Sequence, residues 1–181
     1  MAKLEIFFPI KPIQITQAFG VNGDFYKANG INIKGHNGLD LNAYTGQPVY
    51  AAHDGMCFVQ VDSKQGHGVV LITEDEREYV SPNCPEGRAV FKTIYWHLLP
   101  TIPVSNGQRV RCGDLLGFAD STGLSTAPHL HFGLKPIRYK FGSVQDGTDL
   151  SGWENIEQDN GYLGAIDPTP YFNNYYAFDY K

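Results

Sequence analysis

Apolar and polar residues alternate along several short segments of the chain, and this alternation predicts half-buried β-strands. Turns rich in Gly or Pro separate most of the segments. Two stretches without a period, residues 21–34 and 74–88, are expected to be loops, and residues 135–164 are also predicted to be loop-like. The predicted strands cover residues 13–19, 39–42, 48–51, 55–62, 68–73, 89–98 and 129–134. Short strands joined by many turns indicate an all-β domain.

The segment 129–134 shows the alternation most clearly. Its three apolar side chains can anchor the strand in a core, so the opposite face presents His129 and His131 side by side. Imidazole is both the commonest metal ligand in proteins and the usual general base near neutral pH. Taken alone, the His-x-His pattern is equally compatible with two surface histidines on an edge strand.

A second pair of polar residues, His36 and Asp40, flanks the Asn37-Gly38 turn signal. In a fully extended chain the two residues would lie about 13 Å apart, too far to share a metal ion. The turn can fold His36 back toward Asp40. A fifth residue, His97, ends the predicted strand 89–98.

These five side chains lie at strand ends or beside turns, where functional residues gather on a β scaffold. A catalytic zinc site typically takes three ligands from His and Asp or Glu, so the set can hold a metal and still leave two free imidazoles. Spacing alone leaves open whether His129, His131 or both would bind the ion. His53 and His67 are expected in exposed turns without a ligand role.

Composition adds limits rather than a function. The chain has 181 residues, enough for one domain, and 20 Gly with 11 Pro agree with many turns. Its net charge is -5 and it has no run of Lys or Arg, so we expect no nucleic-acid partner and no anionic membrane surface as a partner. We also expect no membrane span and no signal peptide, because no apolar run is long enough for either.

Several motifs in a fixed order make the chain similar to the lysostaphin-type zinc endopeptidases, also called the LytM family. The motifs are His36-x-x-x-Asp40, Gly46-x-Pro48-Val49-x-Ala51 with Asp54-Gly55, Tyr95-x-His97-Leu98, Gly107-Gln108-x-Val110 and Gly123-x-Ser125-Thr126-x-Pro128-His129-Leu130-His131-Phe132. The joint pattern is far more specific than any one motif. We therefore expect one peptidase domain over residues 1–181, with a core at about 13–135 and a loop-rich C-terminal extension at 136–181.

The resemblance implies an antiparallel β-sandwich of the duplicated hybrid type with long loops around a groove. It also implies that His36, Asp40 and His131 ligate zinc, while His97 and His129 are unligated catalytic histidines. Family members cut peptide bonds in the stem or cross-bridge peptides of bacterial peptidoglycan. The mechanism expected from this set is metal-assisted hydrolysis, with one of the two free histidines as the base.

Other aspects stay open at this point. The loops at 74–87 and 135–164 look long for the family, so the bond that is cut does not carry over from the resemblance. A catalytically silent cell-wall-binding or activator module is the alternative function. We expect a monomer that acts outside the cytoplasm at the cell wall, either secreted or phage- or virion-associated. Part of the aromatic tail beyond residue 167 is expected to pack on the domain.

Overall fold

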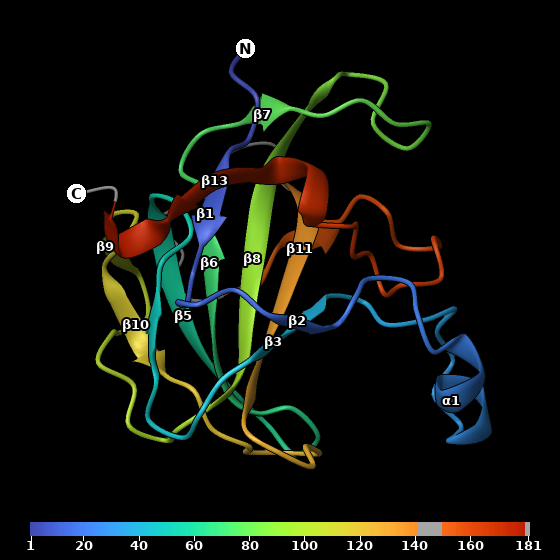
Figure 1. The fold of residues 1–181 in the computed structure, drawn as a ribbon. Helices are drawn as coiled ribbons and strands as arrows, with labels where there is room; N and C mark the ends of the chain where they lie inside the picture. The colour runs from blue at the N-terminus through green and yellow to red at the C-terminus, as the bar shows by residue number, and fades with distance from the viewer. Residues whose placement is uncertain (141–149, 180–181) are drawn as a thin grey trace.

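The computed structural model describes residues 1–140 and 150–179 and consists mostly of β-strands (Figure 1). Parts of the predicted extension, residues 141–149 and 180–181, lie outside the described residues. The elements in chain order are β1 (Ile6–Phe8), β2 (Ile15–Gln17), α1 (Gly23–Ala28), β3 (Leu39–Asn42), β4 (Pro48–Tyr50), β5 (Gly55–Asp62), β6 (Gly66–Ile72), β7 (Arg77–Glu78), β8 (Arg88–Leu98), β9 (Gln108–Val110), β10 (Leu115–Phe118), β11 (His129–Tyr139), β12 (Trp153–Asn155), the 3-10 turn η1 (Thr169–Tyr171), β13 (Phe172–Tyr176) and the 3-10 turn η2 (Ala177–Asp179).

A large antiparallel sheet forms the frame of the molecule, in the order β2-β3-β11-β8-β6-β5-β9. The two longest strands, β8 and β11, lie side by side at its centre and pair from His131 opposite Trp96 to Ile137 opposite Val90. β3 flanks the other edge of β11 and places Asp40 opposite His131. The central ladder therefore carries residues of the candidate site on neighbouring strands.

Two small sheets, β4 with β10 and β1 with β13, contribute to a core on one face of the large sheet. The largest fully buried side chains there include Tyr95 and Phe132, whose ring centroids lie 5.3 Å apart in an edge-on arrangement. The predicted all-β class and antiparallel sandwich are confirmed. Side chains outside residues 13–135, such as Ile6 and Ile10, also belong to this core.

The C-terminal aromatic segment packs on the domain, as predicted. Phe172 of β13 stacks on Phe8 of β1 with 4.4 Å between ring centroids and lies 5.5 Å from Phe132. β13 runs parallel to β1, and the two strands lie beside each other in Figure 1. The first and last strands of the chain thus close the same side of the core.

The structure differs from the sequence-based prediction in three loops. Residues 21–34 contain the six-residue helix α1, which projects from the side of the sheet beside β2 and β3 in Figure 1. β7 lies in the 74–88 stretch, and β11 continues to Tyr139, where it pairs with β12. No helix among the described residues is long and apolar enough to cross a membrane.

Two histidines outside the candidate site also differ from expectation. His67 lies in β6 rather than in a turn. His53 is in a bend, but its side chain is buried: Nδ1 donates to the Asp54 carbonyl at 2.8 Å, and Nε2 lies 2.9 Å from the Thr93 hydroxyl. Nε2 must accept this second bond, because Nδ1 carries the proton. Burial lowers the pKa of His53 from 6.5 to about 4.

We expect this histidine to make the fold sensitive to acid. Between pH 6.5 and 4 the unfolded chain binds a proton at His53 that the folded chain does not, so stability falls as the pH falls through this window. The loss reaches about 3 kcal/mol below pH 4 at the standard conversion per pKa unit. Urea denaturation at several pH values gives the free energy of unfolding as a function of pH. Between pH 6.5 and 4 this free energy should fall less steeply for His53→Gln than for the wild type, and an equal fall would contradict the assignment.

Candidate metal centre

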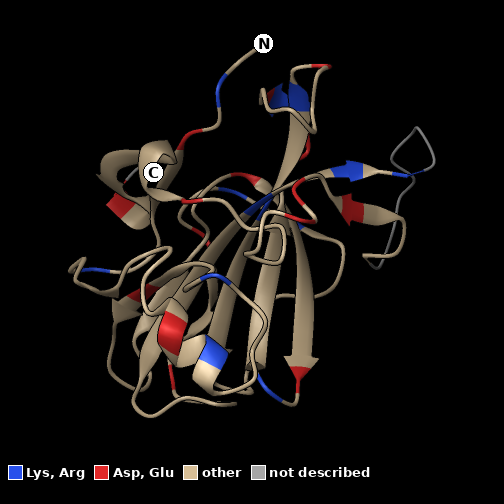
Figure 2. Cartoon of the chain, turned by 90° about the vertical axis from the view of Figure 1, so that its right-hand side faces the viewer, with Lys and Arg blue, Asp and Glu red and all other residues tan. Residues whose placement is uncertain are grey.

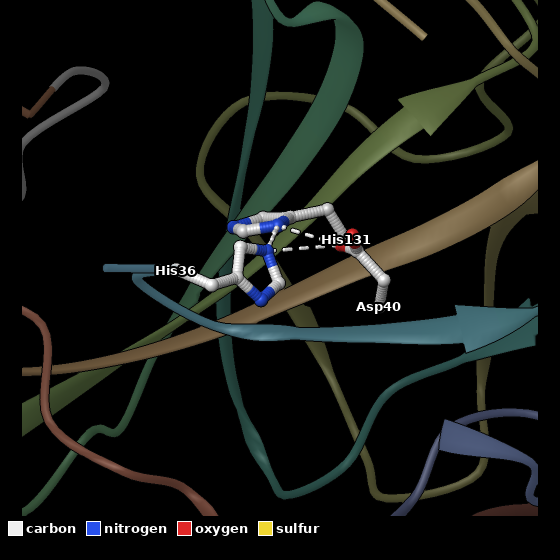
Figure 3. A group of neighbouring side chains, drawn as sticks. All are labelled: His36, Asp40 and His131. Atoms are coloured by element: carbon white, nitrogen blue, oxygen red, sulfur yellow. Dashed lines mark hydrogen bonds and ion pairs between the residues drawn. The ribbon is translucent and has the colours of Figure 1, made fainter. Parts of the chain in front are cut away.

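Three side chains meet at the junction of β3 and β11 (Figure 3). His36 Nε2 lies 3.0 Å from His131 Nδ1 and 3.1 Å from Asp40 Oδ1, and Asp40 Oδ1 lies 3.0 Å from His131 Nδ1. One donor atom from each residue falls within 4.8 Å of the others. Three such atoms at this spacing can face a single cation.

The backbone before β3 brings His36 to this place. Its amide donates to the Val21 carbonyl and its carbonyl accepts from the Gly20 amide, both at 2.8 Å. Gly38 then lets the chain pass close to β11, since a Cβ there would lie 2.6 Å from the Phe132 carbonyl oxygen and 2.8 Å from the ring of His131. The predicted fold-back of His36 toward Asp40 is confirmed.

We therefore expect Gly38→Ala to disturb the cluster although it removes no ligand atom. The added methyl group overlaps the His131 ring and the β11 backbone, so the ring must move. Metal affinity should fall about tenfold or more, as for other changes that misplace a ligand. Zinc titration by calorimetry measures this, with Gly46→Ala as the control: Gly46 has a positive φ of 86°, which Gly38 lacks, and nothing surrounds its added methyl group, so this variant strains the backbone without touching the cluster. Unchanged affinity in Gly38→Ala would contradict the role.

The electrostatics of the cluster favour a cation. Burial alone would raise the pKa of Asp40, but its hydrogen bonds with His131 and His36 outweigh burial and hold the pKa well below the ordinary value. Burial also lowers the pKa of His131. An ionised carboxylate beside a neutral His131 ring is the charge state that a metal site requires, because carboxylate and imidazole ligands bind an ion in their deprotonated forms.

The donor set fits a metal ion in a second way. Nδ1 of His36 lies 3.3 Å from the Ala18 carbonyl oxygen, which can only accept, so with an ion bound Nδ1 would carry the proton and Nε2 would offer its lone pair to the ion in place of its contact with Asp40 Oδ1. Metal-ligating histidines commonly hold their other N–H on a backbone carbonyl in this way. Two imidazoles and one carboxylate match the usual ligands of a catalytic zinc.

His97 and His129, the two predicted catalytic residues, lie beside the cluster. Their ring centroids are 4.6 Å apart, and His129 Nε2 lies 3.6 Å from Asp40 Oδ1. Nδ1 of His97 donates to the Thr122 carbonyl at 2.7 Å, and Nδ1 of His129 donates to the Ala127 carbonyl at 2.9 Å. Each ring is thereby held in the tautomer whose Nε2 can accept a proton.

His97 also has an unusual backbone. Its φ is 66°, in the left-handed region that a non-glycine residue adopts at a cost of about 1–3 kcal/mol. Burial lowers its pKa to about 4, so the ring is neutral at neutral pH. Strained residues of this kind cluster at functional sites, and the strain here supports a role for His97 beyond packing.

Tyr26 of α1 is a neighbour of the site that the sequence did not indicate. Its ring is parallel to that of His36, with an interplanar angle of 3° and 6.3 Å between centroids, and its hydroxyl accepts a hydrogen bond from Gln17 at 3.0 Å. Residues 21–34 show no period, and Asn22, which precedes α1, makes no side-chain capping hydrogen bond. No local signal therefore marked Tyr26.

Comparison with known proteins shows what kind of chain carries this cluster. The model of peptidase family M23 matches residues 34–145, which include all five predicted site residues. The chain belongs to peptidase family M23. The expected resemblance to lysostaphin-type enzymes and the expected class, a family of metallo-endopeptidases, are confirmed by this match.

Individual relatives of this M23 chain agree. It is 33% identical to the glycyl-glycine endopeptidase ALE-1 of Staphylococcus capitis over 65% of this chain and 29% of that protein. It is 35% identical to the peptidoglycan DD-endopeptidase ShyB of Vibrio cholerae over 54% of this chain and 20% of that protein. A solved zinc-containing peptidase from Vibrio cholerae is similar with a TM-score of 0.55 and 31% identity, over 74% of this chain and 37% of that one. The chain thus spans less than a third of these two curated relatives.

Proposed function

We propose that this M23 chain is a zinc-dependent endopeptidase that hydrolyses peptide bonds in the stem or cross-bridge peptides of bacterial peptidoglycan. His36 Nε2, Asp40 Oδ1 and His131 Nδ1 would hold the ion, and His97 and His129 would be the catalytic histidines. The observation that carries the proposal is the convergence of three ligand-type atoms within 4.8 Å, next to two further imidazoles. The similarity to the peptidoglycan DD-endopeptidase ShyB supports the substrate class.

The chain's own residues define the proton transfers. Bound zinc would supply a Lewis acid that polarises the scissile carbonyl and acidifies water. His97 or His129 would accept a proton at Nε2 from the attacking water and return it to the leaving amine. The other could donate to the developing oxyanion only if it entered the reaction protonated at Nε2 as well as at Nδ1. The Thr122 and Ala127 carbonyls would keep Nδ1 protonated through both steps.

The place of action follows from the substrate. Peptidoglycan lies outside the cytoplasmic membrane, so we propose that the enzyme works at the cell wall, as a secreted or phage-associated protein. We propose a monomer, because all five residues come from one chain and each lies beside at least one of the others.

Digestion of purified peptidoglycan tests the proposal. Sacculi with glycine cross-bridges and sacculi with directly linked stem peptides are incubated with the protein, and new amino termini are identified by mass spectrometry. We expect new termini from at least one type, none after removal of metal with a chelator, and restoration by zinc. Binding to sacculi without any new terminus in the zinc-loaded protein would instead indicate the silent cell-wall-binding module.

A further inference from the structure

The face of the large sheet opposite the main core carries two lysines side by side. Lys92 of β8 and Lys135 of β11 are register partners in the antiparallel ladder. Directly opposite residues have Cβ atoms about 4.5–5.5 Å apart, and like charges at that separation destabilise a sheet. Two cations here therefore require an explanation.

Their surroundings are mainly apolar. The side chains on this face form a second apolar cluster, which comprises Phe58, Val70, Ile72, Val90, Ile94 and Ile137. Both lysines are half-buried among these strands. Figure 2 shows the long strands mostly free of charged residues, which lie chiefly in loops and near strand ends.

No carboxylate in the described part of the chain forms an ion pair with either lysine. Lys135 Nζ donates to the Leu163 carbonyl at 2.7 Å, which leaves two of its three N–H donors for another acceptor. Burial lowers the pKa of Lys92, and burial together with the neighbouring charge of Lys92 lowers the pKa of Lys135 to about 8. Both shifts have the sign expected of cations that lack a counterion.

The same face leads directly to the metal centre. Along β11, His131, Gly133 and Lys135 alternate onto one side, and their partners on β8 are Trp96, Ile94 and Lys92. Lys135 lies four positions after His131 along β11, a span of about 13 Å. Gly133 has no side chain, so β11 itself places none between the two sites; the nearest atoms to a Cβ there would be those of Ile94 at 3.6 Å and the Asn37 carbonyl oxygen at 3.7 Å, which line the path.

We propose that Lys92 and Lys135 form a subsite for a carboxylate of the peptide substrate, about 13 Å from the metal centre. This inference rests on the proposed function, because it assigns a substrate to the same face. A carboxylate there would accept charge-assisted hydrogen bonds from both ammonium groups and relieve their repulsion. At about 3.3 Å per extended residue, it would belong to a group some four residues from the scissile bond, or nearer on a long side chain.

Binding of one stem tetrapeptide in four forms tests the subsite. The probe is L-alanyl-γ-D-glutamyl-L-lysyl-D-alanine with both carboxylates free, with either one amidated, or with both amidated, titrated into the zinc-loaded chain by calorimetry. We expect amidation of one of the carboxylates to raise Kd about tenfold or more, the usual scale for a hydrogen bond to a charged group. The form that loses affinity identifies whether the glutamyl or the terminal carboxylate is bound.

Variants separate the subsite from general charge effects. Lys92→Gln and Lys135→Gln should bind the free and amidated forms with equal Kd, whereas Lys3→Gln, which removes the same charge at an exposed position, should keep the wild-type preference. Thermal denaturation of each variant verifies the fold. Equal binding of all four forms by the wild type, or a preference that survives in both lysine variants, would overturn the proposal.

The samples also keep the two proposals apart. Mass spectrometry of the same mixtures, and of sacculi digested in parallel, reports any cleavage. A preference for the free carboxylate without cleavage of any substrate would support the subsite and reject the endopeptidase function. Cleavage without such a preference would support the endopeptidase function and reject the subsite.

Discussion

His131→Ala is expected to lose both the metal ion and hydrolysis. His131 supplies one of the three converging donor atoms. Without it, only His36 and Asp40 remain as ligands for the ion. A metal contributes several kcal/mol of transition-state stabilisation, so the rate should fall by about a thousandfold or more. Zinc affinity should fall by at least a hundredfold, beyond the effect of changes outside the ligand set.

Metal content and rate are measured on the same preparations, by elemental analysis after dialysis and by release of new amino termini from sacculi. His67→Ala is the matched control, since His67 is a half-buried histidine of β6 outside the cluster. It should retain one zinc per chain and the wild-type rate. Stoichiometric zinc with an unchanged rate in His131→Ala would reject the ligand assignment.

The second large effect is expected at His97, where a substitution should abolish most of the activity but leave the metal ion bound. His97→Asn should lower kcat by about a hundredfold or more, the usual contribution of a positioned acid or base, and should leave zinc binding intact. Asparagine suits the test because it tolerates the left-handed backbone that His97 adopts at φ 66°. The melting temperature should therefore stay close to that of the wild type.

His129→Asn provides the parallel measurement. Its ring lies beside His97 and donates to the Ala127 carbonyl, so a similar fall in kcat with zinc retained is expected. If the two histidines act as a unit, the double variant should be little slower than the slower single variant. Wild-type kcat in His97→Asn would remove that residue from the proposed mechanism.

Alternation and turn signals predicted most of the large sheet because they report local contacts. The sequence placed His129 and His131 on one face but left open which of them meets His36 and Asp40. That choice depends on the register between β3 and β11, which sets Asp40 opposite His131. Register joins residues far apart in the sequence, so no local pattern reveals it.

Other misses have identifiable causes. Asp, Gly, Gln and Asn dominate residues 135–164 and predicted a loop there, but β11 continues to Tyr139 and accommodates a residue type that usually disrupts a ladder, Pro136. The carbonyl of Pro136 accepts a hydrogen bond from the Ile156 amide, so this residue's backbone polar groups point away from β8. The missing N–H of proline therefore removes no hydrogen bond between β11 and β8. The lysine pair went unnoticed for the reason that hid the register: Lys92 and Lys135 become neighbours only when β8 and β11 pair.

The parallel pairing of β1 with β13 has a consequence for the order of folding. The two strands lie far apart in the sequence, so closing the long loop between them costs conformational entropy. Only contacts with the domain formed by the intervening chain can offset that cost. During synthesis, β1 has to wait until β13 has left the ribosome, and Phe8 lacks its stacking partner Phe172 until then. The central strands can pair earlier, which makes the joining of the two ends a late event in folding.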